Sequence, residues 1–138
     1  MTYHPWRELR GRPEIDVQWA ALPLDVSALV EGTSITIDSR LTQVQRRCSL
    51  LHELLHVERG VPHGVDEREE SLVEQEVARR LVPLEQLVDA LRWSRHPREV
   101  ADHCWVTVDV ILTRAEHLHP SERHYLRRAL ADDEGETA

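Results

Sequence analysis

The sequence has no phenylalanine, and aromatic residues make up only 4% of its 138 residues, so leucine and valine must build the core. Two cysteines, Cys48 and Cys104, are too few for a disulfide framework and fit reduced thiols in a core. No apolar run is long enough to span a membrane, and the first fourteen residues lack the apolar stretch of a signal peptide. We therefore expect a cytoplasmic protein without a membrane partner.

Basic residues are also scarce, with 17 lysines and arginines against 25 acidic residues and a net charge of −8. This balance opposes a free-standing DNA-binding protein, which usually carries a basic excess, but it leaves protein substrates open. Hydrophobic residues make up 41% of the chain and charged residues 30%, which is typical of a soluble globular protein.

The N-terminal third has the alternating pattern of strands. Residues 14–22 alternate around Val17, and residues 32–40 alternate around Ile35 and Ile37, so each segment predicts a half-buried strand. Val26 and the pair at 29–30 predict a third, shorter strand.

From Leu41 onward the apolar period becomes helical. The predicted stripe consists of Leu41, Val44, Cys48, Leu51 and Leu55. Thr42 can cap the start of this helix, and Gly60 and Pro62 end it. Because Leu50 and Leu54 project from the opposite side, we expect this helix to be buried on both sides and central to the fold.

Further helices are predicted to the C-terminus. Asp66 can cap a helix that runs to about Val82, and Pro83 can begin the next one. Later helices are predicted at 97–104, about 108–118 and about 121–131. The polar end, 132–138, predicts a disordered tail.

The first predicted helix contains His52-Glu53-Leu54-Leu55-His56, an HExxH pattern. Side chains four residues apart on a helix lie on one face, so both imidazoles can reach one zinc ion. Glu53 lies one step further round, where a carboxylate can accept a proton from a zinc-bound water. The alternative is a pair of solvated histidines on an exposed helix, which the leucines on both sides disfavour.

A third ligand is expected from the following helix. Glu70 lies in line with the apolar stripe that includes Val73 and Val77, whereas Glu76 points to the far side. A carboxylate within a buried stripe is costly unless it is paired or bound to a metal. The alternative for Glu70 is an exposed residue favoured by the helix dipole. Glu74 can either hold the N–H of a ligating histidine or pair with an arginine.

Two segments, "GTSITIDSRLTQVQRRCSLLHELLHVERG" and "EESLVEQEVARRLVP", resemble the ImmA/IrrE-type metallopeptidases, small gluzincins known mostly from bacteria, phages and mobile elements. The resemblance implies a zinc-dependent endopeptidase with His52, His56 and Glu70 as zinc ligands and Glu53 as the catalytic base. Members of the family cleave repressors, often helix-turn-helix regulators, and so control phage, mobile-element or stress genes. A repressor of this kind is the expected partner, and DNA is not.

We therefore expect an α+β fold in which a small antiparallel or mixed N-terminal sheet packs on the HExxH helix and the glutamate helix. The predicted metallopeptidase core covers 1–94, and a helical extension covers 95–131 before the tail. Oligomeric state is not predictable from the sequence. An oxyanion-stabilising His or Tyr is also expected, and the sequence does not choose among His63, His103, His117, His119, His124, Tyr3 and Tyr125. His63 is nearest in sequence to the zinc ligands, but a histidine in a loop is more often solvated. Cys48, one turn before His52, can contact the metal or serve as a core thiol, and its place in the apolar stripe favours the thiol.

A second hypothesis is a metal-containing regulatory protein that binds a repressor or DNA without cutting it. Residues 99–118 resemble a helix-turn-helix in outline, with Thr107 as the cap of the second helix. The second helix contains two acidic residues, Asp109 and Glu116, and one basic residue, Arg114. Because acidic residues repel phosphate, this composition disfavours DNA binding. Replacing Glu53 by Gln separates the two hypotheses, because only a peptidase needs this carboxylate.

Overall fold

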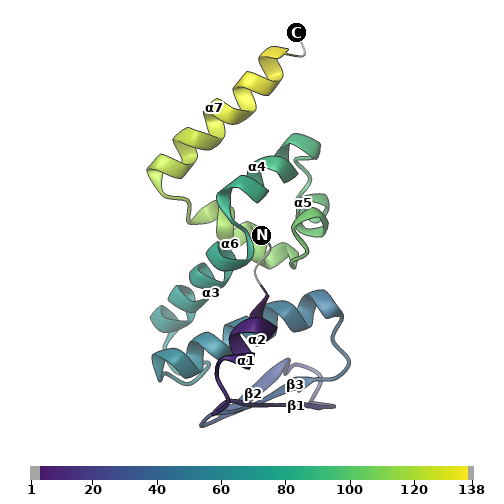
Figure 1. Cartoon of the computed structure of the whole chain (residues 1–138), viewed down its shortest axis with the longest axis vertical. Coiled ribbons are helices and arrows are strands. Elements are labelled where there is room, and N and C mark those ends of the chain that lie inside the picture. The colour runs from purple at the N-terminus through teal and green to yellow at the C-terminus, as the bar shows by residue number, and fades with distance from the viewer. Residues whose placement is uncertain (1–3, 137–138) are drawn as a thin grey trace. The chain divides into compact units, whose positions relative to one another are not determined.

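The computed structural model describes residues 4–136, with side chains to residue 132, and it has an α+β fold (Figure 1). Its described residues form a three-stranded mixed sheet and seven helices. The chain divides into two compact units, 1–77 and 78–138. This division falls within a helix, residues 67–81, and the metallopeptidase core over 1–94 stays a prediction.

The sheet of the N-terminal unit consists of β1 (Asp16–Ala20), β2 (Ala28–Glu31) and β3 (Ser34–Asp38) in the order β1-β3-β2. Strand β3 pairs parallel with β1 and antiparallel with β2, so the sheet is mixed, one of the two predicted alternatives. The turn between β2 and β3 places Gly32 at φ +61, a conformation that glycine adopts without strain. Strands β1 and β3 lie within the two segments predicted from alternation, and β2 overlaps the third, shorter strand predicted at Val26 and residues 29–30.

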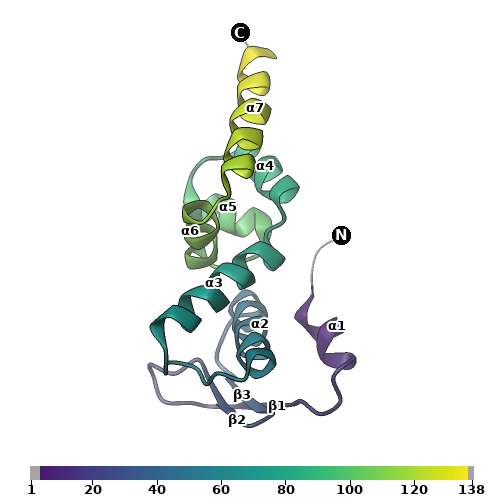
Figure 2. The same cartoon turned by 90° about the vertical axis from the view of Figure 1, so that its left-hand side faces the viewer.

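Helix α2 (Gln43–Arg59) lies on one face of this sheet, as two perpendicular views show (Figures 1 and 2). Thr42 and Gln45 form a capping box at its start, and Gly60 ends it at φ +70. Leu50 and Leu54 pack against buried isoleucines of the strand region, and Leu51 and Leu55 are buried as well. The prediction of a helix buried on both sides is therefore confirmed.

Helix α3 (Glu67–Leu81) begins where the sequence predicted, after Asp66. The Asp66 carboxylate accepts hydrogen bonds from the backbone N–H groups of Arg68 and Glu69 at 2.9 and 3.3 Å. Arg59 at the end of α2 donates two hydrogen bonds to Glu69, at 2.6 and 3.0 Å. These contacts fix the first turn of α3, which carries Glu70, beside the last turns of α2.

A short helix that the sequence did not predict, α1 (Pro5–Arg10), precedes the sheet. Trp6 and Leu9 pack against the core of the sheet and α2. Two apolar residues three positions apart are too few to establish a helical period, so the sequence pattern does not predict this helix.

The C-terminal unit contains α4 (Leu84–Trp93), α5 (Pro97–Cys104), α6 (Val108–Glu116) and α7 (Pro120–Glu136). Helix α4 packs against α5 and α7. Helix α7 continues to Glu136 and so includes most of the segment predicted as a disordered tail. Residues 132–136 contain no proline, so the helical hydrogen bonds can continue through them despite their polarity.

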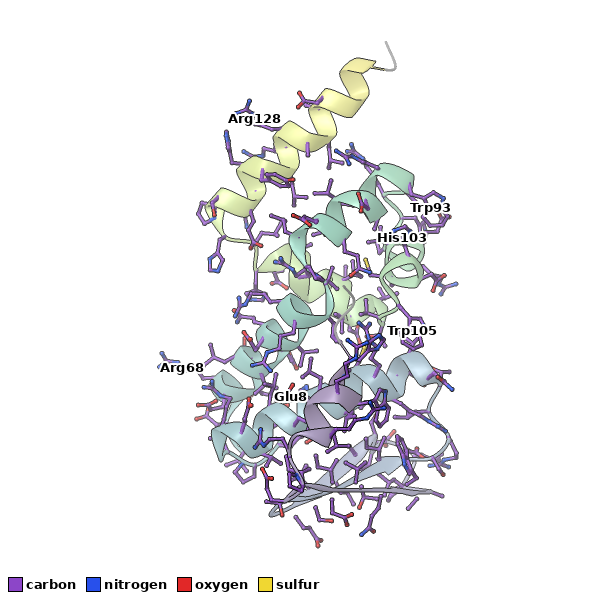
Figure 3. All side chains as sticks on the ribbon, viewed as in Figure 1. Glu8, Arg68, Trp93, His103, Trp105 and Arg128 are labelled. Carbon is purple, nitrogen blue, oxygen red and sulfur yellow. The ribbon has the colours of Figure 1, made fainter. Side chains whose placement is uncertain are left out.

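The connection between α5 and α6 matches the predicted helix-turn-helix outline. Trp105 ends α5 at φ 56, and Thr107 is the N-cap of α6 without a side-chain hydrogen bond. Trp93 stacks on His103 with ring centroids 5.9 Å apart (Figure 3). Arg114 is buried in this unit, where its Nε donates to the carbonyl of Val82 at 2.8 Å and its two terminal nitrogens donate to Glu122.

Among the described residues, no helix combines the length and the apolar character that crossing a bilayer requires.

Candidate metal centre

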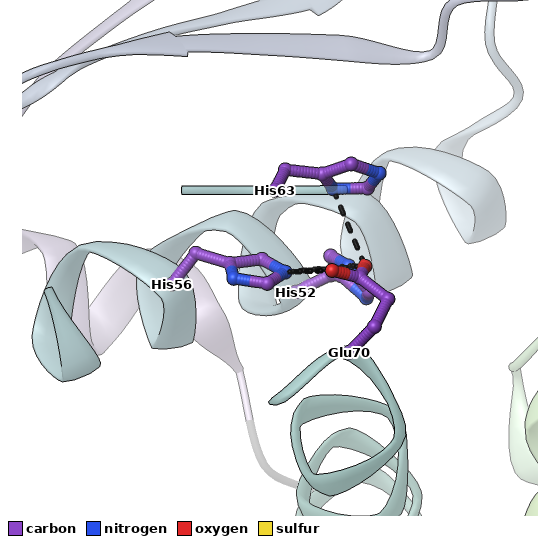
Figure 4. Close-up of side chains that lie close together, drawn as sticks. All are labelled: His52, His56, His63 and Glu70. Carbon is purple, nitrogen blue, oxygen red and sulfur yellow. Dashed lines mark hydrogen bonds and ion pairs between the residues drawn. The ribbon is translucent and has the colours of Figure 1, made fainter. Parts of the chain in front are cut away.

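Helices α2 and α3 bring the predicted ligands together (Figure 4). Nε2 of His52 lies 2.7 Å from Oε1 of Glu70, and Nε2 of His56 lies 3.0 Å from Oε2 of Glu70. The two Nε2 atoms are 3.1 Å apart. Ligand atoms of a tetrahedral zinc ion with bonds of about 2.0 Å lie about 3.3 Å apart, so this cluster is slightly tighter than a loaded site.

A hydrogen bond to the backbone fixes the ring orientation of His56. Its Nδ1 donates a hydrogen bond to the backbone carbonyl of Val61 at 3.0 Å. A carbonyl only accepts, so Nδ1 carries the proton, and in the neutral ring Nε2 presents a lone pair toward Glu70. The sequence predicted that Glu74 might support a ligand in this way, but Glu74 is exposed and the Val61 carbonyl holds His56 instead.

The charges in the cluster favour a cation. Partial burial raises the pKa of Glu70, but hydrogen bonds from the Gly64 N–H, His52 and His56 outweigh it and lower the pKa to about 2. Glu70 is therefore ionised at neutral pH. Burial lowers the pKa of His52 despite the opposing effect of Glu70, which favours the neutral imidazole there. An ionised carboxylate 2.7–3.2 Å from two imidazole nitrogens attracts positive charge, and this group of side chains could hold a divalent metal ion.

Glu53 lies beside the cluster and is almost completely buried, with 3% of its surface exposed. Its Oε1 lies 3.0 Å from Nδ1 of His63, and its Oε2 has no hydrogen-bond partner among the described residues. Burial raises the pKa of Glu53, although the nearby His63 and His56 partly offset this effect. A carboxylate with a raised pKa is suited to accept and return a proton near neutral pH.

His63 joins the cluster, which the sequence did not establish. One donor atom from each of His52, His56, His63 and Glu70 lies within 4.8 Å of the others, so this group can hold a metal ion. His63 follows α2 in a loop, where periodicity gives no information, and its proximity in sequence to His56 was the only available signal. Cys48 is buried and is not part of this group, in agreement with a core thiol.

Comparison with protein-family models, curated proteins and solved structures gives no match for this chain. The resemblance to ImmA/IrrE-type metallopeptidases therefore stays a prediction from the sequence motifs. The geometry of the cluster is independent of that resemblance.

Proposed function

We propose that this protein is a zinc-dependent endopeptidase that cleaves a regulatory protein. The observation that carries the proposal is the buried carboxylate of Glu53, unpartnered at Oε2, beside two imidazoles and a carboxylate that converge on one point. An unsatisfied buried carboxylate costs stability and is expected where chemistry requires it. The HExxH pattern and the resemblance described above support the same function.

The residue types in the cluster fit a zinc ion, which His52, His56 and Glu70 would bind as ligands. When bound, zinc supplies Lewis acidity, which polarises a peptide carbonyl and lowers the pKa of water. Glu53 accepts a proton from the attacking water while the oxygen of that water forms a bond to the carbonyl carbon. It then returns the proton to the leaving nitrogen as the C–N bond breaks. The Val61 carbonyl keeps His56 in the tautomer that this arrangement needs.

The proposed substrate is a helix-turn-helix repressor, which the family resemblance supports. The net charge of −8 is compatible with this choice, because DNA-binding regulators are usually basic and an acidic protein attracts them. This part of the proposal concerns the partner and does not affect the metal centre.

The test compares zinc-loaded wild-type protein with Glu53→Gln. Each is incubated with a purified helix-turn-helix repressor and with a pool of proteome-derived peptides, and the products are identified by mass spectrometry. Wild type should produce new termini, and Glu53→Gln should retain zinc but produce none. Glu58→Gln, an exposed change in the same helix, is the matched control and should cleave normally. No cleavage by wild type, or equal cleavage by Glu53→Gln, refutes the proposal.

A second function, regulation by binding without cleavage, is favoured by one observation. Four protein donors surround the site, and zinc sites with four protein ligands are usually structural. In that case the Glu53→Gln protein keeps its full biological output, because binding does not require a base.

A further inference from the structure

His63 lies against both the proposed base and the proposed metal ligands. Its Nδ1 is 3.0 Å from Oε1 of Glu53 and 3.5 Å from Oε1 of Glu70. Its ring centroid is 5.0 Å from that of His52 and 5.2 Å from that of His56. The imidazole thus contacts the proposed base Glu53 and lies beside the proposed ligands, as Figure 4 shows for His52, His56 and Glu70.

The backbone on both sides of His63 is tied to the ligands. The carbonyl of Val61 accepts a hydrogen bond from His56, and the N–H of Gly64 donates one to Oε2 of Glu70 at 3.1 Å. Gly64 has φ +79, which a residue with a side chain rarely adopts. The loop therefore presents His63 to the cluster through the same residues that would hold the metal.

The side chain of His63 is held much less firmly than its backbone, since 52% of it is exposed. Rotating the imidazole away from the cluster breaks its contact with Glu53 but leaves the backbone hydrogen bonds of Val61 and Gly64, which do not involve this side chain. Structural zinc sites have four protein ligands, whereas catalytic sites keep one position open. A fourth donor on an exposed side chain allows one site to adopt both states.

We propose that His63 is a displaceable fourth metal donor that closes the centre at rest and rotates out when a substrate binds. The inference deepens the proposed function and rests on it for the role of the substrate. It differs from the expected role of an oxyanion-stabilising residue. Such a residue lies across the scissile carbonyl from the attacking water, whereas His63 contacts the base itself.

The direct test counts the imidazoles around the metal. Zinc-loaded wild type, His63→Ala and His124→Ala are compared by X-ray absorption spectroscopy without substrate. His124 is an exposed histidine of α7 and serves as the matched control. We expect three imidazoles in wild type and in His124→Ala, and two in His63→Ala. In a chelator competition, zinc affinity of His63→Ala should fall roughly ten- to hundredfold, the size of effect reported for groups that support a metal site. Two imidazoles in the wild type overturn the inference.

Cleavage at saturating zinc supplies the second measurement. His63→Ala should cleave faster than wild type, because no donor has to be displaced, and slower cleavage with unchanged zinc affinity overturns the inference in favour of an oxyanion role. If the wild type shows three imidazoles around zinc but cleaves nothing, the proposed function is refuted. The assignment of His63 as a metal ligand then still holds. Circular dichroism confirms that each variant is folded.

Discussion

Glu53 is the residue that has the least favourable environment in the described part of the candidate site. It is buried, its Oε2 has no partner there, and burial raises its pKa. A buried charge without full hydrogen bonding destabilises a fold, so the core would be more stable without it. The cost is understandable if the carboxylate is kept for proton transfer.

We predict that Glu53→Gln stabilises the metal-free protein by about 1 kcal/mol, since the amide removes a buried charge of the same shape. Urea unfolding of metal-free proteins at pH 7 measures the difference. The exposed change Glu58→Gln should stay within about 0.5 kcal/mol of wild type. A lower stability for Glu53→Gln would show that the carboxylate contributes to folding.

His52, His56 and Glu70 were predictable because all three lie on helices. A fixed angle per residue placed the imidazoles on one face and put Glu70 in line with a buried stripe, and the structure brings them together. His63 was not predictable as a member of the cluster. Its position depends on the hydrogen bonds of Val61 and Gly64, which follow no sequence period.

At the scale of elements, the end of α2 depends on the left-handed conformation of Gly60. We predict that Gly60→Ala destabilises the protein by about 1–2 kcal/mol, the cost of that conformation for a residue with a side chain. Gly11 ends α1 at φ −82, which alanine adopts readily, and a Cβ there makes an ordinary contact with the Glu8 carbonyl at 3.5 Å. Thermal or urea unfolding should therefore separate Gly60→Ala from a near-neutral Gly11→Ala. Equal effects would contradict this account of the cap.

In the C-terminal unit, α6 and α7 are joined by the buried Arg114 and by Glu122. Hydrogen bonds from Arg114 lower the pKa of Glu122 despite partial burial. A carboxyl whose pKa is lower in the folded state contributes stability above its unfolded pKa of 4.5, and the contribution is lost as pH falls through the folded value.

We predict that Glu122→Gln costs about 1–3 kcal/mol at pH 7, because it leaves the buried guanidinium poorly compensated. The difference from wild type should shrink as the pH falls below 4.5. Urea unfolding from pH 3 to 7 measures it, with the exposed change Glu116→Gln in α6 as control. A difference that does not vary with pH would rule out the ion pair as its source.

Most helices and all three strands were predictable from apolar periods and from caps such as Thr42 and Asp66. Three features were not. Helix α1 is too short to show an apolar period. Helix α4 is assigned to the C-terminal unit by its packing. Helix α7 continues through residues whose polarity predicted a disordered tail. Tertiary contacts and helix continuation decide these features, and a local pattern contains neither.

At the scale of the whole molecule, all four candidate donors lie between residues 52 and 70, within the N-terminal unit. The centre is thus formed by one helix, a short loop and the first turn of the next helix. Arg114 of the helix-turn-helix-like segment is buried against Val82 and Glu122, so this guanidinium is paired within its own unit and does not face a phosphate.

The zinc content of the purified protein tests the central claim most directly. Metal analysis after gel filtration should find one zinc per chain in wild type and in Glu74→Ala. The zinc affinity of Glu70→Ala should fall by at least about a hundredfold. This variant removes a metal ligand, and loss of a group that only supports a ligand already lowers metal affinity roughly ten- to hundredfold. Glu74 lies one turn further along α3 and is exposed, so it is the matched control. A wild-type protein that binds no zinc, or a Glu70→Ala protein that binds it as tightly as wild type, would contradict the account.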